Sequence, residues 1–175
     1  MSEVLFSSDS HFHHKKILEY CPNRKGSTVE EMNELLVQAW NDKVRPEDTV
    51  YHLGDVSFGK YINTLEILKR LNGKIHLILG NHDKGMKEGA IPQRFASIQE
   101  YKTIKLDEKH IVLFHFPIES WDRQSYGSIH LHGHTHNSTS HGDVPKMFNR
   151  MDAGVDTRED MAPWAWDEIK EYLEG

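Results

Sequence analysis

The sequence contains very little cysteine and no long hydrophobic run. Cys21 is the only cysteine, which excludes a disulfide within the chain and a zinc site built from several cysteines. The longest strongly apolar stretch covers residues 111–114, far short of the roughly 20 residues that a membrane-spanning helix needs. The N-terminal residues include Glu3 and lack a basic segment, so we expect no signal peptide. We therefore expect a cytoplasmic protein with no membrane partner.

An excess of positive charge is also missing. Lys and Arg number 21 against 27 Asp and Glu, which gives a formal net charge of −6 at pH 7. Stable binding of a long nucleic acid relies on a basic surface that neutralises phosphates. We therefore expect no such partner, although a local positive site can still hold a small phosphate ester.

The rest of the composition is that of an ordinary globular protein. The chain has 175 residues, of which 37% are hydrophobic and 27% charged, and it contains no Pro/Gly/Ser-rich linker. Length and composition therefore predict a single domain that covers residues 1–175.

Short apolar runs alternate with helical patterns along the chain. The runs predict five buried strands, at residues 4–6, 50–53, 75–79, 111–114 and 129–131. Helical spacing predicts helices over residues 28–41, 62–71 and 166–173, the first of them opened by a capping box of Ser27 and Glu30. This alternation predicts an α/β protein, and the strand-rich second half indicates a second sheet.

Each predicted strand is followed directly by polar residues that can bind a metal ion. Histidine is abundant, with 13 residues, and several stand at these strand ends. The segments are Asp9-Ser10-His11, Gly54-Asp55, Gly80-Asn81-His82-Asp83, His115 and Gly133-His134-Thr135-His136. Ligand sites of α/β proteins form at the carboxyl ends of strands. The side chains that we expect to meet there are Asp9, His11, Asp55, Asn81, His115, His134 and His136.

These residue types suit two metal ions. A carboxylate can bridge two cations because each of its oxygens can bind one. Imidazole suits several transition metals, and oxygen ligands favour the harder ones. We therefore expect two divalent ions, with manganese as the first choice and iron, nickel, cobalt or zinc as alternatives. A glycine precedes a ligand at Gly54, Gly80 and Gly133, which is typical of sharp turns and close packing.

The motif series DSH, GD, GNHD, H and GHTH resembles that of the calcineurin-like metallophosphoesterase superfamily. The motifs run from residue 9 to residue 136, and the combination of GNHD with GHTH is specific. The sequence is most similar to the small single-domain bacterial and phage phosphoesterases. This resemblance implies a four-layer α/β/β/α sandwich, with two mixed sheets flanked by helices and a two-metal site at one edge.

The resemblance also implies a role for each motif residue. One metal would bind Asp9, His11, Asp55 and His136, and the other would bind Asp55, Asn81, His115 and His134, with Asp55 as the bridge. His82 matches the family's catalytic histidine, and Asp83 stands where the family often has an acid that orients it. We expect a metal-dependent phosphodiesterase in which a hydroxide held between the two ions attacks phosphorus while His82 assists the leaving group.

The sequence departs from the family pattern in two places. His115 lacks the glycine that usually stands beside the histidine of the fourth motif, so His110 is kept as a rival ligand. The segment after Gly54-Asp55 lacks the Asp-Arg pair of the protein phosphatases, which argues against phosphoprotein substrates. We expect a small phosphate ester as substrate, such as a cyclic nucleotide or a short oligonucleotide.

Two alternative functions stay open. One is a phosphomonoesterase or nucleotidase of the same fold, and the other is a non-catalytic scaffold that binds metal and protein partners. The presence of His82 favours an enzyme. His14 and Trp121 are further candidates for substrate contact, His132 faces either the site or the second sheet, and no metal role is expected for His52, His76, His130 and His141.

Overall fold

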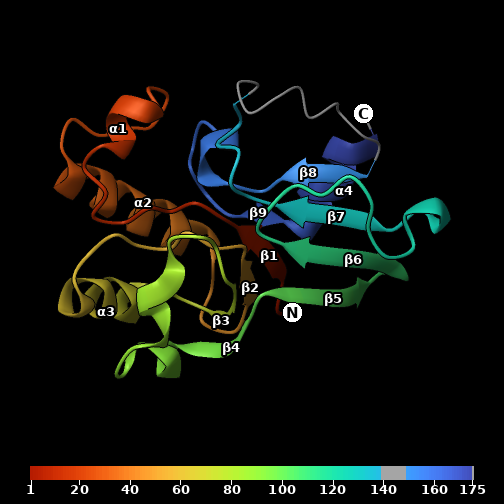
Figure 1. Ribbon diagram of the computed structural model, residues 1–175, viewed down its shortest axis with the longest axis horizontal. Coiled ribbons are helices and arrows are strands. Elements are labelled where there is room, and N and C mark those ends of the chain that lie inside the picture. Colours follow the sequence, from red (N-terminus) through yellow and green to blue (C-terminus); the bar gives the residue numbers. More distant parts are fainter. Residues whose placement is uncertain (139–148, 175) are drawn as a thin grey trace.

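The strands form two sheets that lie face to face. The computed structural model describes residues 1–138 and 149–174. The first sheet, in the order β4-β3-β2-β1-β9, contains β1 (Val4–Ser7), β2 (Thr49–His52), β3 (Lys74–Ile78), β4 (Phe95–Gln99) and β9 (Trp164–Ala165). The second, in the order β5-β6-β7-β8, contains β5 (Tyr101–Leu106), β6 (Lys109–Phe114), β7 (Ile129–His132) and β8 (Arg150–Asp152). Figure 1 shows the second sheet on one side of the first and helices α1, α2 and α3 on the other.

Both sheets are mixed. Strands β1 to β4 pair in parallel, and β9 joins the edge of β1 antiparallel. In the second sheet β6, β7 and β8 are parallel, while β5 pairs antiparallel with β6. Parallel pairing collects the carboxyl ends of neighbouring strands at one edge of each sheet. The predicted α/β fold with two mixed sheets is confirmed.

Four α-helices and four short 3-10 helices occur in the described part of the chain. The α-helices are α1 (Ile17–Tyr20), α2 (Val29–Lys43), α3 (Tyr61–Arg70) and α4 (Trp166–Glu174). The 3-10 helices are η1 (Asp83–Lys87), η2 (Ile91–Arg94), η3 (Gln124–Tyr126) and η4 (Val155–Thr157).

The N-terminus of α2 differs by one residue from the prediction. Thr28 is the N-cap, and its side chain accepts a hydrogen bond from the backbone N–H of Glu31 at 3.2 Å. The carboxylate of Glu31 accepts the N–H of Ser27 at 2.8 Å. Thr28 and Glu31 therefore cap the helix in place of the predicted pair, Ser27 and Glu30. Both pairs have the three-residue spacing of a capping box.

Two apolar cores hold the layers together, one on each face of the first sheet. Neighbouring residues of a strand point to opposite faces, so Leu5 lies in the core beneath α2 and α3, whereas Phe6 lies between the two sheets. The helix-side core includes Met32, Leu36, Val50, Leu68 and Ile75. The core between the sheets includes Leu53, Ile78, Ile111, Leu113 and Leu131. Full burial of each such side chain stabilises the fold by roughly 1.5–3 kcal/mol.

The outer face of the second sheet is covered by residues 116–128. The ring of Trp121 lies 5.4 Å from that of His130 on β7, centroid to centroid. The backbone N–H of Ile118 also donates to His130 Nε2 at 3.3 Å. The cover over this part of the sheet is therefore a loop with the short helix η3.

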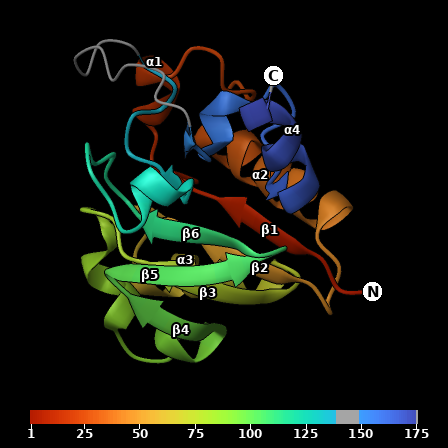
Figure 2. The ribbon, with the colours of Figure 1, turned by 90° about the vertical axis from the view of Figure 1, so that its right-hand side faces the viewer.

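Helix α4 packs against the core between the sheets and against α2. Trp166 and Ile169 belong to that core, and Lys43 Nζ at the end of α2 lies 2.6 Å from a carboxylate oxygen of Glu168. Figure 2 shows β5 and β6 in front of β2 and β3, with α4 beside α2. Among the helices of residues 1–138 and 149–174, none combines the length and the apolar composition needed to cross a lipid bilayer.

Candidate metal centre

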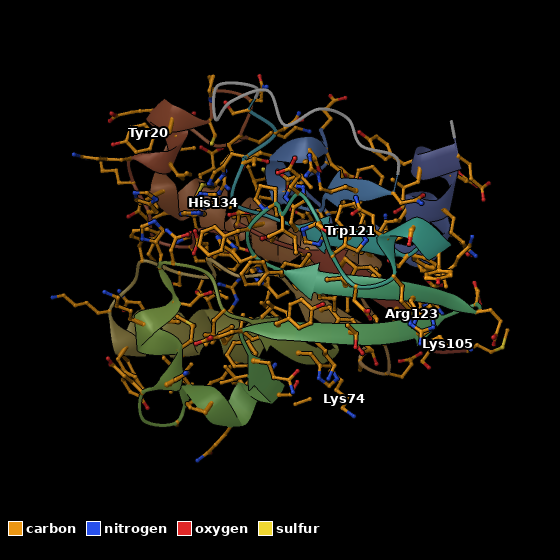
Figure 3. The ribbon with its side chains drawn as sticks, turned by 45° about the vertical axis from the view of Figure 1, so that its right-hand side comes forward. Tyr20, Lys74, Lys105, Trp121, Arg123 and His134 are labelled. Carbon is orange, nitrogen blue, oxygen red and sulfur yellow. The ribbon has the colours of Figure 1, made fainter. Side chains whose placement is uncertain are left out.

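The loops after β1, β2, β3, β6 and β7 meet at one edge of the sandwich. The backbone N–H of Asp9 donates to Gly54 O at 2.9 Å, which joins the loops after β1 and β2. The N–H of His134 donates to Asp9 Oδ2 at 2.9 Å, which joins the two sheets. Figure 3 labels His134 at this edge, far across the view from Lys74 at the start of β3. The predicted convergence of the five strand ends is therefore observed.

The first cluster at this edge contains Asp9, His11 and His136. One ligand atom from each of these residues lies within 4.8 Å of those of the other two. Both His11 Nε2 and His136 Nε2 lie 3.7 Å from Asp9 Oδ1. One carboxylate oxygen and two imidazole nitrogens thus face a common point.

The second cluster contains Asp55, His115 and His134, again within 4.8 Å of one another. The side-chain oxygen of Asn81 lies 3.1 Å from His115 Nε2 and extends this set. His115 Nδ1 lies 2.6 Å from the carbonyl oxygen of Leu53, so the other ring nitrogen faces the cluster. The rival His110 lies at the opposite end of β6, with its Nε2 3.2 Å from Arg123. The structure therefore brings His115, and not His110, to the site.

Asp55 lies between the two clusters. Its Oδ2 is 3.5 Å from His11 Nε2 in the first cluster and 3.5 Å from His115 Nε2 in the second. Its other oxygen accepts the backbone N–H of His82 at 2.9 Å, which fixes the orientation of the carboxylate. One carboxylate oxygen therefore faces both clusters, and the grouping of the residues matches the two ligand sets that the resemblance implies.

The residues present fit metal ions. Among the described residues, Asp9 Oδ1 and His11 Nε2 are buried side-chain atoms without a hydrogen-bond partner. Buried polar atoms are nearly always paired, because an unpaired one costs free energy. A cation bound between these atoms would satisfy both. Carboxylate oxygen, imidazole nitrogen and amide oxygen together suit divalent transition metals without selecting one of them.

The backbone at this edge is strained. Left-handed φ angles between 48° and 71° occur at Asp9, His11, Asp55, His134 and His136. Such conformations cost of order 1–3 kcal/mol each in residues other than glycine and persist where the surrounding structure enforces them. The packing of the two cores therefore offsets this strain and keeps the ligand residues in their strained backbone conformations.

Two motif glycines make room for the carboxylates. A Cβ atom on Gly80 would lie 2.2 Å from Asp55 Oδ1, and one on Gly133 would lie 2.3 Å from Asp9 Oδ2. Both distances are far below van der Waals contact. Any larger residue at these positions would therefore displace a carboxylate of the site.

Opposite charges stabilise each other in this buried region. Burial by itself raises the pKa of Asp9 and Asp55, but neighbouring histidines, chiefly His11, His115 and His136, hold both pKa values well below the ordinary range. Burial lowers the pKa of His136, yet hydrogen bonding to Asp156 and Cys21 and the charge of Asp9 raise it to about 10. A cation that binds here would displace protons from the histidines.

His82 and Asp83 follow β3 but have different surroundings. His82 is exposed, and its ring lies 4.6 Å from that of Phe58 and 6.0 Å from that of His11, between centroids. Asp83 is buried, and its carboxylate accepts the backbone N–H groups of Asp55, Val56 and Gly80 at 2.7–2.9 Å. The His82 ring is not among the hydrogen-bond partners of Asp83. Asp83 therefore holds the backbone of Asp55, and the predicted contact with His82 is not observed.

A buried ion pair behind the first cluster was not anticipated from the sequence. Asp156 Oδ2 lies 2.7 Å from His136 Nδ1, which directs the other ring nitrogen toward Asp9. The Arg24 guanidinium binds Asp156 through Nε at 2.7 Å and also donates to the carbonyl oxygens of Asp9 and Ser10. Arg24 and Asp156 lie outside every motif, so only the folded chain reveals their role.

A cavity of about 670 Å³ opens beside the first cluster. Its lining includes His11, His136 and His82 from the site, and also His14, Tyr20 and Phe58. Of the two further candidates for substrate contact, His14 lines this cavity. Trp121 is 7% exposed and donates its indole N–H to Ser128, so it packs against β7 and does not line the cavity.

Three further histidines of the described residues, His52, His76 and His132, lie outside the two clusters. The ring of His132 lies 5.4 Å from that of His130, on the face of β7 opposite Ile129 and Leu131, so His132 belongs to the outer side of the second sheet. His52 forms a side-chain hydrogen bond with Ser10, and His76 forms one with Ser97. His141 lies outside the described residues.

Comparison with known proteins identifies the family of the chain. Residues 3–149 match the family described as "Calcineurin-like phosphoesterase superfamily domain". An uncharacterized protein of Methanocaldococcus jannaschii is 39% identical over 138 residues, which cover 78% of this chain and 70% of that protein. The gene 66 protein of Mycobacterium phage L5 is 30% identical over 164 residues, which cover 78% of each chain.

Two solved structures share the fold. A protein of unknown function from Aquifex aeolicus has a TM-score of 0.79 and 26% sequence identity, covering 98% of this chain and 100% of its own. A protein described as a novel archaeal phosphodiesterase has a TM-score of 0.50 and 18% identity, covering 87% of this chain and 83% of its own. The chain therefore belongs to the calcineurin-like phosphoesterase superfamily, and its activity class is that of a metal-dependent phosphoesterase.

Proposed function

We propose that this protein is a phosphodiesterase that uses two divalent metal ions to hydrolyse small phosphate esters. The observation that carries the proposal is the position of Asp55, whose Oδ2 lies 3.5 Å from a histidine of each cluster. A carboxylate shared between two clusters of histidines suits a pair of cations, because one carboxylate can bind both. Cyclic nucleotides and short oligonucleotides are the proposed substrates, and manganese is the first metal to try.

The two ligand sets divide the site residues between two ions. Asp9, His11 and His136 would hold one ion, and Asn81, His115 and His134 the other, with Asp55 shared. When bound, a pair of divalent ions lowers the pKa of a shared water and neutralises charge on the phosphoryl oxygens. Besides its place as a ligand, Asp9 accepts the N–H of His134 through its other oxygen, and the buried Asp83 carboxylate supports the site by holding the backbone of Asp55.

His82 is the proposed proton donor to the leaving oxygen. Its backbone N–H is held by Asp55 Oδ1 at 2.9 Å, and its ring lines the cavity beside the clusters. A group in this position can reach an ester oxygen without displacing a metal ligand. General acid catalysis of this kind contributes typically about 10²–10⁴-fold to the rate.

Hydrolysis of matched aryl esters tests the proposal. The protein is stripped with chelator, resupplied with Mn²⁺, and assayed on bis(4-nitrophenyl) phosphate, on 4-nitrophenyl phosphate, and on a diester with a poor alkyl leaving group. We expect metal-dependent cleavage with a higher kcat/KM for the aryl diester than for the monoester. His82→Ala should lower kcat on the alkyl diester by at least about 100-fold, while His110→Ala, at the far end of β6, should not.

Three results would contradict parts of the proposal. Preference for the monoester would indicate a phosphomonoesterase. Equal turnover of the alkyl diester by wild type and His82→Ala would remove His82 from the reaction. Bound metal without turnover of any of the three esters would favour the non-catalytic scaffold.

A further inference from the structure

The cavity beside the first cluster carries a row of aromatic rings. The ring centroids of Tyr20 and His14 lie 6.3 Å apart, those of His14 and Phe58 3.9 Å, and those of Phe58 and His82 4.6 Å. Tyr20, His14, Phe58 and His82 are called the aromatic row below. The row leads from α1 to the proposed proton donor, and Figure 3 shows Tyr20 on α1 at the same end of the molecule as His134.

Two members of the row are large and exposed. Tyr20 is 65% exposed and Phe58 is 40% exposed, although both line the cavity. Neither has a part in the proposed reaction. Exposed aromatic surface that gathers in a cavity, instead of being scattered over the surface, is typical of a ligand site.

The rest of the described lining includes apolar side chains, neutral amides, and small thiol and hydroxyl groups. Ile17 and Pro22 add apolar surface beside the row, and the exposed residues Asn23 and Asn137 add amide groups. Stacking surface next to amide donors and acceptors suits a heterocyclic base, which has two flat faces and a polar edge. The volume of about 670 Å³ lies within the usual range for small-ligand sites.

The charge of the lining favours one base over a long strand. Within the part of the lining that the structure describes, Asp156 is the one charged side chain besides the histidines, and it is paired with Arg24. A run of further phosphates would meet no Lys or Arg side chain along this described lining. An uncharged ring is the better match.

We propose that the aromatic row binds the heterocyclic base of a nucleotide whose phosphate reaches the two metal-ligand clusters. The inference rests on the proposed function and names its substrate class, the phosphate esters of nucleosides. Tyr20 would stack on the base, and Phe58, whose ring already stacks on His14, would contact the base through the surface that it still exposes. Asn23 and Asn137 would approach the polar edge of the base. Specificity then resides in α1 and in the loop after β2, outside the motifs of the metal centre.

Equilibrium binding separates the base from the phosphate. Titration calorimetry of the Mn²⁺-loaded protein compares adenosine 5′-monophosphate with ribose 5-phosphate, which share the sugar and the phosphate and differ by the base. We expect the nucleotide to bind at least about tenfold more tightly, as one stacked base allows. Tyr20→Ala, an exposed position, and Phe58→Leu, which keeps apolar volume but removes the flat ring, should each reduce this ratio. Tyr126→Ala, at an exposed tyrosine in η3, should keep it.

Equal affinity of the wild type for the two ligands would overturn the inference, and so would an unchanged ratio in both Tyr20→Ala and Phe58→Leu. The binding measurement needs no turnover, so the two proposals can fail separately. Base-dependent binding without hydrolysis of any ester would support the aromatic row and contradict the phosphodiesterase. Hydrolysis of aryl diesters without base-dependent binding would support the phosphodiesterase and contradict the role of the aromatic row.

Discussion

Arg24 connects three segments of the site from a fully buried position. It pairs with Asp156 and donates to the carbonyl oxygens of Asp9 and Ser10. Removing the guanidinium would leave two carbonyl groups without this donor, and would leave the buried Asp156 carboxylate paired with His136 but no longer with an arginine. We predict that Arg24→Gln lowers the free energy of unfolding by about 3–5 kcal/mol, the usual cost of breaking a buried ion pair.

Arg70→Gln is the matched control for Arg24→Gln. Arg70 forms a bidentate ion pair with Glu34, but both side chains are exposed. Exposed ion pairs contribute about 0–1 kcal/mol. Unfolding of both variants in denaturant checks the comparison. Equal losses of unfolding free energy would show that the buried ion pair of Arg24 contributes no more than the exposed pair of Arg70.

His130 should make the protein sensitive to acid. Burial, followed by the neighbouring His132, lowers the pKa of His130 to about 4. Between pH 6.5 and about pH 4, the His130 ring is protonated in the unfolded chain but stays neutral in the folded chain. Stability contributed by neutral His130 is therefore complete above pH 6.5 and is lost between pH 6.5 and 4, by roughly 3 kcal/mol in total.

His130→Gln tests the origin of this acid sensitivity. Glutamine is polar and does not titrate, so the variant should lose less stability than the wild type between pH 7 and pH 4.5. The free energy of unfolding, measured in urea at both pH values, gives the difference. An identical loss in both proteins would assign the acid sensitivity to other groups.

Gly133, the first residue of the GHTH motif and the residue directly after β7, sets the position of the Asp9 carboxylate. A Cβ atom on Gly133 would lie 1.9 Å from Ser8 Oγ and 2.3 Å from Asp9 Oδ2. We predict that Gly133→Ala weakens Mn²⁺ binding at least about tenfold and lowers stability by about 1–3 kcal/mol, as overpacking does. Gly85→Ala is the control, because a Cβ there meets nothing within 4 Å. Metal affinity of Gly133→Ala equal to that of Gly85→Ala would contradict this role.

The strands that the sequence predicted are those with short runs rich in Val, Ile and Leu. Strands β1, β2, β3, β6 and β7 are buried on at least one core face, so burial selected apolar residues along them. Strand β5 was not predicted because it lies at a sheet edge and its residues alternate between exposed and half-buried. Strands β8 and β9 have three and two residues, too few for any periodic pattern.

The candidate site was predictable as far as strand ends define it. Each of the seven proposed ligands follows a strand closely, so the rule that sites form at carboxyl strand ends brought them together. Arg24 and Asp156 were missed because they act on the ligands from segments with no motif. The contacts of Asp83 were missed because hydrogen bonds to backbone N–H groups leave no pattern in the sequence.

At the scale of the whole molecule, the two sheets supply different types of metal ligand. The first sheet supplies Asp9, His11, Asp55 and Asn81, and the second supplies His115, His134 and His136. Both acidic ligands therefore come from one sheet, and three of the four histidine ligands come from the other. The core between the sheets, which includes Phe6, Leu53 and Leu113, keeps them in register. Metal binding should consequently depend on the packing of this core as well as on the ligands themselves.

We expect two divalent ions to bind, with Asp55 shared between them. Titration of the chelator-treated protein with Mn²⁺, with bound metal counted by elemental analysis after removal of free ions, tests this expectation. We predict two ions per wild-type chain and fewer than two for Asp55→Asn, with Asp42→Asn on the exposed face of α2 as the control. One ion or none in the wild type, or two tightly bound ions in Asp55→Asn, would contradict it.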